Sequence, residues 1–137
     1  MVGMPLPDLH VAAIALVRDR RVLMVTARGR DVHYMPGGKL DAGETPAEAA
    51  AREALEEVGL VLDPAGLVEA FTVRELAHGQ GEGQHVRMHV FLAETDAAPV
   101  PSNEVGALHW VGTADTHRCP PAGAEVLRRL AASGLID

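Results

Sequence analysis

The sequence has little with which to hold nucleic acid, cross a membrane or form disulfides. Only 3% of its residues are aromatic, and 12 lysines and arginines face 19 aspartates and glutamates, giving a formal net charge of −7. This balance disfavours binding to duplex nucleic acid or an anionic membrane surface, because both require a basic footprint. No apolar run approaches the roughly 18 residues of a membrane-spanning helix. The single cysteine, Cys119, cannot form an internal disulfide, which favours a reducing, cytoplasmic location.

What the sequence does contain is typical of one globular domain. The chain has 137 residues, of which 47% are hydrophobic and 23% charged. It shows neither an internal repeat nor a low-complexity tract. We therefore expect a single domain over residues 1–137 with a core large enough to need no disulfide or structural metal.

Hydrophobic patterning predicts two helices around a mixed sheet. Apolar runs predict strands at His10–Arg18, Arg21–Thr26, Leu67–Leu76, His85–Glu94 and Val105–Val111, and amphipathic patterns predict helices at Thr45–Val58 and Ala122–Ala132. Pro36, Gly37 and Gly38 are expected to break any strand. The fold class is thus α+β, packed as an α/β/α sandwich.

The first helix has strong boundary signals and an unusual polar face. Thr45, Pro46 and Glu48 form a capping-box start, and Gly59 provides a left-handed stop. At about 100° per residue, three glutamates share one face. These glutamates are Glu53, Glu56 and Glu57. They lie opposite an apolar arc formed by Ala47, Ala50, Ala51, Ala54, Leu55 and Val58.

These glutamates repel one another and the negative end of the helix dipole, which costs roughly 0.3–1 kcal/mol for each acid in the last turn. A bound divalent cation would remove the conflict, and an oxygen-only ligand set favours Mg²⁺ or Mn²⁺. The simpler interpretation is a solvated acidic face. Gly37, Gly38 and Gly43, just before the helix, favour the cation, because they permit close approach of backbone groups to a phosphate.

The spacing of these residues resembles the Nudix box, G-x5-E-x7-R-E-U-x-E-E-x-G-U, of the MutT-like Nudix hydrolases. Every fixed polar and glycine position of that motif matches between Gly38 and Leu60, including Glu44 and the pair Arg52-Glu53. Ala54 stands where the family has a larger aliphatic residue, which affects packing and not chemistry. The resemblance implies the Nudix fold over nearly the whole chain.

The resemblance implies Mg²⁺- or Mn²⁺-dependent hydrolysis of the pyrophosphate bond of a nucleoside diphosphate linked to another group, releasing a nucleoside monophosphate. Nucleoside triphosphates, including oxidised ones, are among the substrates it leaves open, as is a homodimer. The implied cation ligands are Glu53, Glu56, Glu57 and the Gly37 carbonyl. Arg52 would orient the carboxylates, while Glu56 would also be the catalytic base.

Residues outside the box add weaker candidates. Arg28, Lys39 and Gly38 are candidate substrate-binding residues, with a plain surface role equally open for the two cations. Glu104 is an alternative catalytic base, although a surface loop acid is the simpler interpretation. On the strand at 85–94 the side chains of His85, Arg87, His89 and Phe91 share one face, which either lines a substrate pocket or is solvated. Tyr34 and Trp110 are able to stack on a base, but packing is favoured for both.

The same residues bear on two other functions. A non-catalytic nucleotide-binding module is the alternative, and it is disfavoured because all the acids of the motif are present. A calcium-binding EF-hand is excluded, because Asp41 to Glu53 lacks the alternating oxygen ligands of such a loop.

Overall fold

The computed structural model describes residues 6–77 and 83–137, and its centre is a mixed six-stranded sheet. The strands are β1 (Leu9–Arg18), β2 (Arg21–Ala27), β3 (Gly37–Lys39), β4 (Val68–Leu76), β5 (His85–Ala93) and β6 (Val105–Val111). Their order is β4-β5-β1-β2-β6, and β3 pairs with β1. The β1–β5 pair is parallel and the other pairs are antiparallel.

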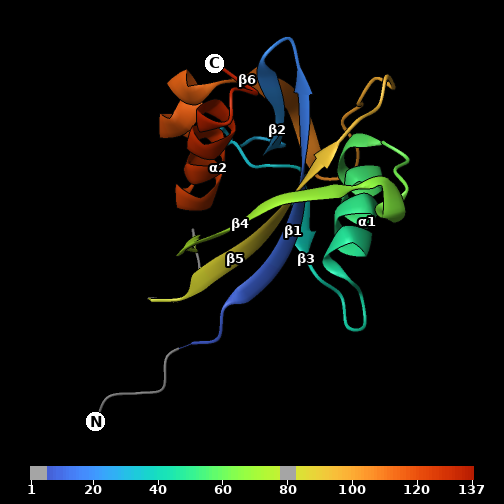
Figure 1. Ribbon diagram of the computed structural model, residues 1–137, viewed down its shortest axis with the longest axis vertical. Coiled ribbons are helices and arrows are strands. Elements are labelled where there is room, and N and C mark those ends of the chain that lie inside the picture. The colour runs from blue at the N-terminus through green and yellow to red at the C-terminus, as the bar shows by residue number, and fades with distance from the viewer. Residues whose placement is uncertain (1–5, 78–82) are drawn as a thin grey trace.

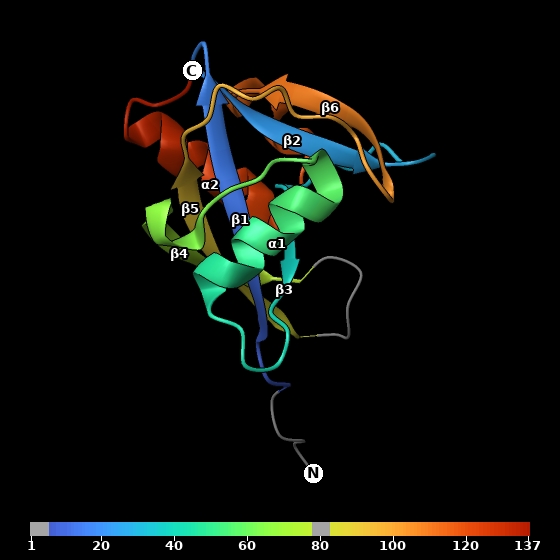
Figure 2. The same cartoon turned by 90° about the vertical axis from the view of Figure 1, so that its right-hand side faces the viewer.

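Two helices cover opposite faces of this sheet. Figure 1 shows α2 (Pro121–Ala132) on one side and α1 (Pro46–Val58) on the other, and Figure 2 shows α1 lying across β1. This arrangement confirms the α+β fold class with a mixed sheet between helices. Two short 3₁₀ turns, η1 (Pro64–Gly66) and η2 (Thr113–Arg118), have no counterpart in the sequence prediction. No helix of the described residues is long and apolar enough to span a membrane.

The central strand β1 supplies side chains to both halves of the core. Ala12 and Ile14 pack with α1, whereas Ala13 and Ala15 pack with α2. This alternation follows from the two-residue period of a strand, which sends successive side chains to opposite faces. The predicted core face of α1 needs one correction. Leu55, at the edge of the predicted apolar arc, is half exposed.

The boundaries of α1 follow the predicted signals. The Glu48 amide donates to Thr45 Oγ1 over 3.1 Å and the Thr45 amide donates to a Glu48 carboxylate oxygen over 2.9 Å, closing the capping box. Gly59 ends the helix at φ 66°, in the left-handed region that favours glycine. The helix is therefore fixed in length at both ends, which sets the depth of the acids in its last turn.

The expectation that Gly37 and Gly38 break any strand is wrong. Residues 37–39 form β3, which pairs antiparallel with residues 11–13 of β1. Glycine is needed here because the two strands lie very close together, and not because the chain turns. A Cβ on Gly37 would collide with the Ala12 carbonyl oxygen. This contact brings β3 against β1, and the Gly37 amide also donates to Glu57 at the end of α1.

Candidate active site

Glu53 and Glu57 on the acidic face of α1 are packed against β3, whereas Glu56 on the same face is exposed to solvent. A Cβ added to Gly38 would lie 2.6 Å from Oε1 of Glu53, so only glycine leaves room for that carboxylate. The Glu53 side chain is 15% exposed, whereas that of Glu56 is 49% exposed. Burial raises the pKa of Glu53 although Arg52 beside it acts in the opposite direction. The strand and helix therefore hold a desolvated carboxylate between them.

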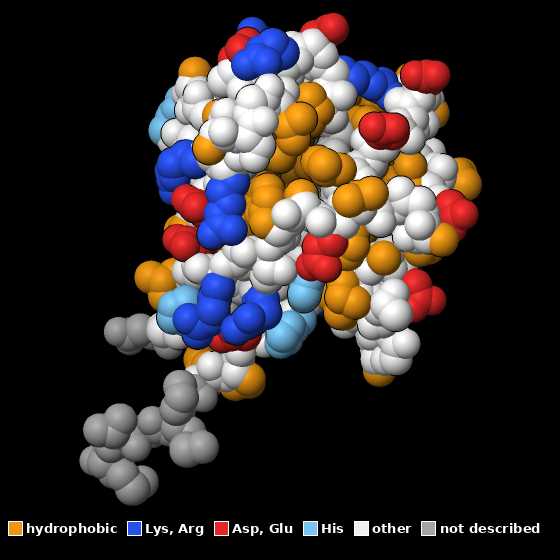
Figure 3. Space-filling model, in the orientation of Figure 1, with side chains coloured by type: hydrophobic (Ala, Val, Ile, Leu, Met, Phe, Trp, Pro, Cys, Tyr) orange, Lys and Arg blue, Asp and Glu red, His pale blue; other side chains and the backbone are white. Residues whose placement is uncertain are grey.

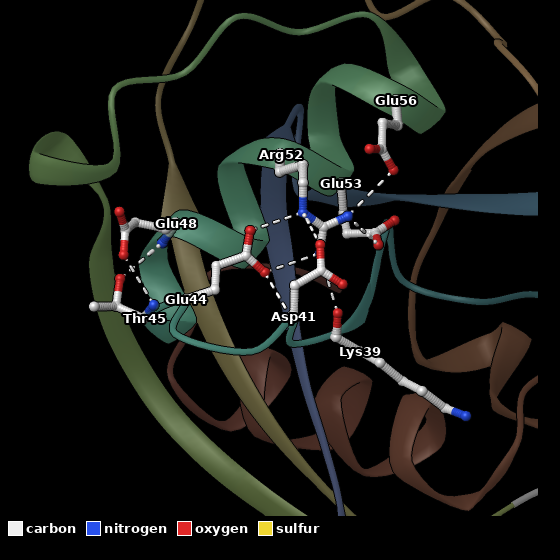
Figure 4. Close-up of polar contacts among 8 residues, drawn as sticks. All are labelled: Lys39, Asp41, Glu44, Thr45, Glu48, Arg52, Glu53 and Glu56. Atoms are coloured by element: carbon white, nitrogen blue, oxygen red, sulfur yellow. Dashed lines mark hydrogen bonds and ion pairs between the residues drawn. The ribbon is translucent and has the colours of Figure 1, made fainter.

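Arg52 is the centre of the polar network around these acids. Figure 4 shows its guanidinium group between the loop before α1 and the helix itself. It donates to Glu44 over 2.7 Å, to Glu53 over 2.9 Å and, more weakly, to Glu56 over 3.3 Å. Another of its nitrogens donates to the Lys39 carbonyl oxygen over 3.1 Å. Arg52 thus ties the loop, β3 and two acids of α1 into one unit.

Two carboxylates of the loop complete this network. The Glu44 carboxylate accepts from Arg52 and from the Asp41 amide, and these bonds lower its pKa to about 2. Asp41 itself lies 3.3 Å from the Arg52 Nε atom. Sequence reasoning missed Asp41, because the position is variable in the motif. Glu48, one turn before Arg52, takes no part in this network, because its carboxylate accepts from the Thr45 amide in the helix cap.

Glu57 is the most perturbed acid of the cluster. It accepts a hydrogen bond from the Gly37 amide over 2.8 Å, and burial raises its pKa from 4.5 to about 7. The charges of Glu53, Glu104 and Glu56 raise this pKa further. A half-buried carboxylate among like charges is a strong attractor for a cation.

Glu104 reaches the site from the loop before β6. It lines the same cavity as Glu57, and its charge contributes to the raised pKa of Glu57. The sequence left Glu104 as a surface acid or a site acid, and the structure places it at the site. The sequence signal for this candidate is its position immediately before β6, the edge strand that pairs with β2.

A cavity of about 330 Å³ opens beside these acids. One end is formed by polar groups of the site, namely Gly37, Gly38, Lys39, Glu57 and Glu104. The remaining wall is mainly apolar, with Leu9 and Val11 of β1, Val86 and Met88 of β5, and Ala122 and Gly123 of α2 among the lining residues. The cavity therefore joins an acidic end to an apolar end, as expected for a ligand with a polar head and a flatter, less polar body.

The predicted substrate-binding residues are only partly brought together. Gly38 and Lys39 line the cavity, but Figure 4 shows the Lys39 side chain extending away from the carboxylates. Arg28 is not a lining residue; its Nε atom donates to the Asn103 carbonyl oxygen over 3.2 Å. Tyr34 lines the cavity, whereas Trp110 packs against the core.

Of the two interpretations of the polar face of β5, the pocket interpretation is wrong. Val86 and Met88 line the cavity, while the polar residues of the opposite face bind elsewhere. His89 pairs with Glu69 over 2.8 Å, and Arg87 pairs with Asp8 over 3.3 Å. Alternation shows which residues share a face but not which face borders the cavity, and polarity alone misled the assignment.

The donor set fits a divalent cation in chemistry. It offers buried or half-buried carboxylate oxygens without a histidine or cysteine, which suits Mg²⁺ or Mn²⁺. Within residues 6–77 and 83–137, however, no three acidic, histidine or cysteine side chains already converge on one point. Glu53 is turned toward Arg52 and Glu57 toward the Gly37 amide.

Figure 3 shows acidic side chains predominating on the α1 side and basic ones on the side of α2 and β4–β5.

Comparison with known proteins decides the family. The model of the NUDIX domain matches residues 8–130, which is most of the chain. The chain belongs to the NUDIX family. This Nudix chain is similar to an 8-oxo-dGTP diphosphatase of Escherichia coli, with 26% identity covering 89% of this chain and 95% of that protein. An 8-oxo-dGTP diphosphatase of Haemophilus influenzae is 58% identical over 69% of this chain and 67% of its own length.

Solved structures agree on the fold of this Nudix chain. A MutT protein from Methanosarcina mazei superposes with a TM-score of 0.75, at 19% identity, covering 96% of this chain and 99% of that one. The family makes the chain a Nudix pyrophosphohydrolase. Nudix hydrolases act on small nucleotides and generally use divalent cations.

Proposed function

We propose that this protein is a Mg²⁺- or Mn²⁺-dependent hydrolase of nucleoside triphosphates, including oxidised ones, that releases a nucleoside monophosphate. The observation that carries the proposal is the half-buried Glu57, whose pKa is raised to about 7, at the acidic end of a cavity that is apolar elsewhere. The similarity to two 8-oxo-dGTP diphosphatases supports the triphosphate class. The lone cysteine fits a reducing compartment, so we place the enzyme in the cytoplasm.

We assign the cation to Glu53, Glu56, Glu57 and the Gly37 carbonyl oxygen. When bound, a divalent cation offsets the charge of the phosphate oxygens and lowers the pKa of a water molecule. Arg52 keeps the carboxylates of Glu53 and Glu56 within reach, because it bonds to both. Glu44 in turn holds Arg52 with two hydrogen bonds, so it acts on the site through the arginine.

We favour Glu104 over Glu56 as the catalytic base. Glu104 lines the cavity, whereas Glu56 is half exposed and bonded to Arg52. In this reaction the water oxygen bonds to a phosphorus atom of the bridge between the α- and β-phosphates, the bridging P–O bond breaks so that nucleoside monophosphate and pyrophosphate separate, and Glu104 takes the proton of the water. A placed general base contributes roughly 10²–10⁴-fold to the rate.

The cavity accounts for the other half of the substrate. Its apolar wall, with Val11, Val86 and Met88, suits the faces of a nucleobase, and Tyr34 at the same cavity is able to stack on it. Gly38 and Lys39 line the cavity beside the carboxylates, and we assign Lys39 and, from outside the cavity lining, Arg28 to the charge of the outer phosphates. The base would thus enter the apolar end while the triphosphate meets the carboxylates.

The test is the release of nucleoside monophosphate from a panel of dNTPs, 8-oxo-dGTP, ADP-ribose and a dinucleoside polyphosphate, each with and without 5–10 mM Mg²⁺ (about the working range for a weak Mg²⁺ site). We expect turnover of triphosphates only with the cation, and its loss in Glu57→Gln. Glu48→Gln is the matched control, because it is the same change on the same helix and glutamine also closes a capping box.

The competing function is a nucleotide-binding module without catalysis. Such a module would bind nucleotides in calorimetry yet release no monophosphate from any member of the panel, with or without Mg²⁺. Full activity of Glu57→Gln would contradict the proposed cation site instead, because that site cannot lose its most buried acid without effect.

A further inference from the structure

The last turn of α1 is completed by a segment far along the chain. The final carbonyl groups of a helix have no partner within the helix, so they need donors from elsewhere. Three such donors come from the loop before β6: the Val100 amide to Val58 (2.9 Å), the Ser102 amide to Glu57 (3.0 Å) and the Asn103 side-chain amide to Glu56 (2.7 Å). The turn that carries two acids of the site is therefore bonded to this loop.

Asn103 is the unusual member of this segment. Its backbone has φ 54°, in the left-handed region that glycine and, less readily, asparagine and aspartate adopt more easily than other residues. It lies in a tight turn closed by the Val105 amide and the Ser102 carbonyl oxygen over 3.1 Å. In this conformation the side chain reaches α1, while the carbonyl oxygen of the same residue accepts from Arg28 Nε over 3.2 Å.

The next residue is Glu104, the acid that faces Glu57. The Glu104 carbonyl oxygen accepts from the Arg28 amide over 3.0 Å, which fixes the backbone on that side. Asn103 fixes it on the other side, to the same helical turn that carries Glu56 and Glu57. The separation between the loop acid and the helix acids is thus set by the Asn103 side-chain hydrogen bond, which is the attachment nearest to Glu104, together with the Ser102 and Val100 backbone bonds to the same turn.

We propose that Asn103 is a positioning residue that holds Glu104 at its working distance from the carboxylates of α1. The inference rests on the proposed function, in which Glu104 receives the proton of the attacking water. Asn103 does not line the cavity in the described structure and so acts through its neighbour. An exposed amide–carbonyl bond contributes modestly to stability, which separates its effect on position from its effect on folding.

The test is a double-mutant cycle between Asn103→Gly and Glu104→Gln. Glycine keeps the left-handed backbone and removes only the amide donor. We expect Asn103→Gly to lower kcat about tenfold to a hundredfold, the cost of displacing a reacting group by about 1 Å, with KM changed less than about twofold. In the Glu104→Gln background the same change is expected to cost less than about twofold, because the group it positions is already lost.

Two further variants complete the experiment. Asn103→Asp keeps the size and backbone preference but aims a carboxylate at the Glu56 carbonyl oxygen, so its kcat is expected to fall at least as far. Asp19→Gly is the matched control, since Asp19 has φ 51° in the β1–β2 turn, and its kcat is expected to stay at the wild-type value. Thermal midpoints of all variants report folding separately.

The outcomes distinguish this inference from the proposed function. Wild-type kcat in Asn103→Gly, or equal losses in both backgrounds of the cycle, would overturn the positioning role. Full activity of Glu104→Gln would also overturn the positioning role. If activity were still lost in Glu57→Gln, the proposed cation-dependent hydrolase would remain supported. Loss of dependence on Glu57 would instead remove the proposed function itself.

Discussion

Replacing Glu57 by glutamine tests the electrostatics of the site without any substrate. The folded protein raises the pKa of this carboxyl from 4.5 to about 7, first through burial and then through the charges of Glu53, Glu104 and Glu56. Because the pKa is raised, the native state binds more protons than the unfolded state between these two values. Stability in the absence of a cation must therefore fall as the pH rises from about 4.5 to 7.

The size of the effect follows from the pKa difference. Each pKa unit is worth about 1.4 kcal/mol, so the ionised Glu57 costs about 3 kcal/mol of unfolding free energy above pH 7. Glu57→Gln removes this charge and keeps an oxygen to accept the Gly37 amide. The variant is expected to be more stable than the wild type by up to about 3 kcal/mol at pH 8, or about 10 °C in midpoint, and equal to it near pH 4.

The assay is urea unfolding of both proteins in EDTA at several values of pH from 4 to 8.5. Taking the difference between wild type and variant at each pH cancels the titration of groups that the two share. Glu48→Gln serves as a control of opposite sign, because the Thr45 cap lowers the pKa of Glu48 and its charge therefore stabilises the fold. A variant less stable than the wild type at pH 8, or a difference that does not change with pH, would refute the reasoning.

A cation reverses the order of stability. Binding to the wild type requires Glu57 to lose its proton, so the affinity for Mg²⁺ or Mn²⁺ is expected to fall by about tenfold per pH unit below pH 7. Saturating cation should then stabilise the wild type and leave Glu57→Gln nearly unchanged. Titration calorimetry in two buffers of different ionisation enthalpy measures the proton release directly.

Three further variants address the support of the site. Gly38→Ala places a Cβ 2.6 Å from Glu53 Oε1, so cation-dependent turnover is expected to fall by more than about tenfold while circular dichroism stays native; unchanged turnover would show that Glu53 has room to move. Arg52→Lys loses the fork that bonds Glu44, and we expect a higher Mg²⁺ requirement in activity titrations. Thr45→Ala should cost about 1 kcal/mol in urea unfolding and leave kcat unchanged, since the cap lies at the other end of α1.

Local signals explain why so much of the fold could be predicted. The capping box at Thr45 and the stop at Gly59 depend on residues a few positions apart, and so do the two-residue periods of β1 and β5. The exception, β3, shows the limit of such signals. From the sequence, Gly37 fits a turn as well as a strand that contacts Ala12. Only the pairing with β1 distinguishes these two possibilities.

The candidate site could also be predicted only where it depends on residues close in the sequence. The acids Glu53 and Glu57 could be identified because they stand on one helix at a fixed spacing, which is the content of the motif. The shifted pKa values of these acids could not be predicted, because burial against β3 and the approach of Glu104 depend on tertiary packing. The apolar wall of the cavity was missed for the same reason: Val86 and Met88 look like ordinary core residues in the sequence.

The loop before β6 shows what a motif leaves unspecified. The box fixes three carboxylates relative to one another, yet a reacting water needs a base at a defined distance from all of them. That distance depends on where the loop is attached, and the attachment is made to the carbonyl groups of the last turn of α1. A helix end has unsatisfied carbonyls whatever its sequence, so a donor such as Asn103 can couple a loop to the site without any residue of the motif changing.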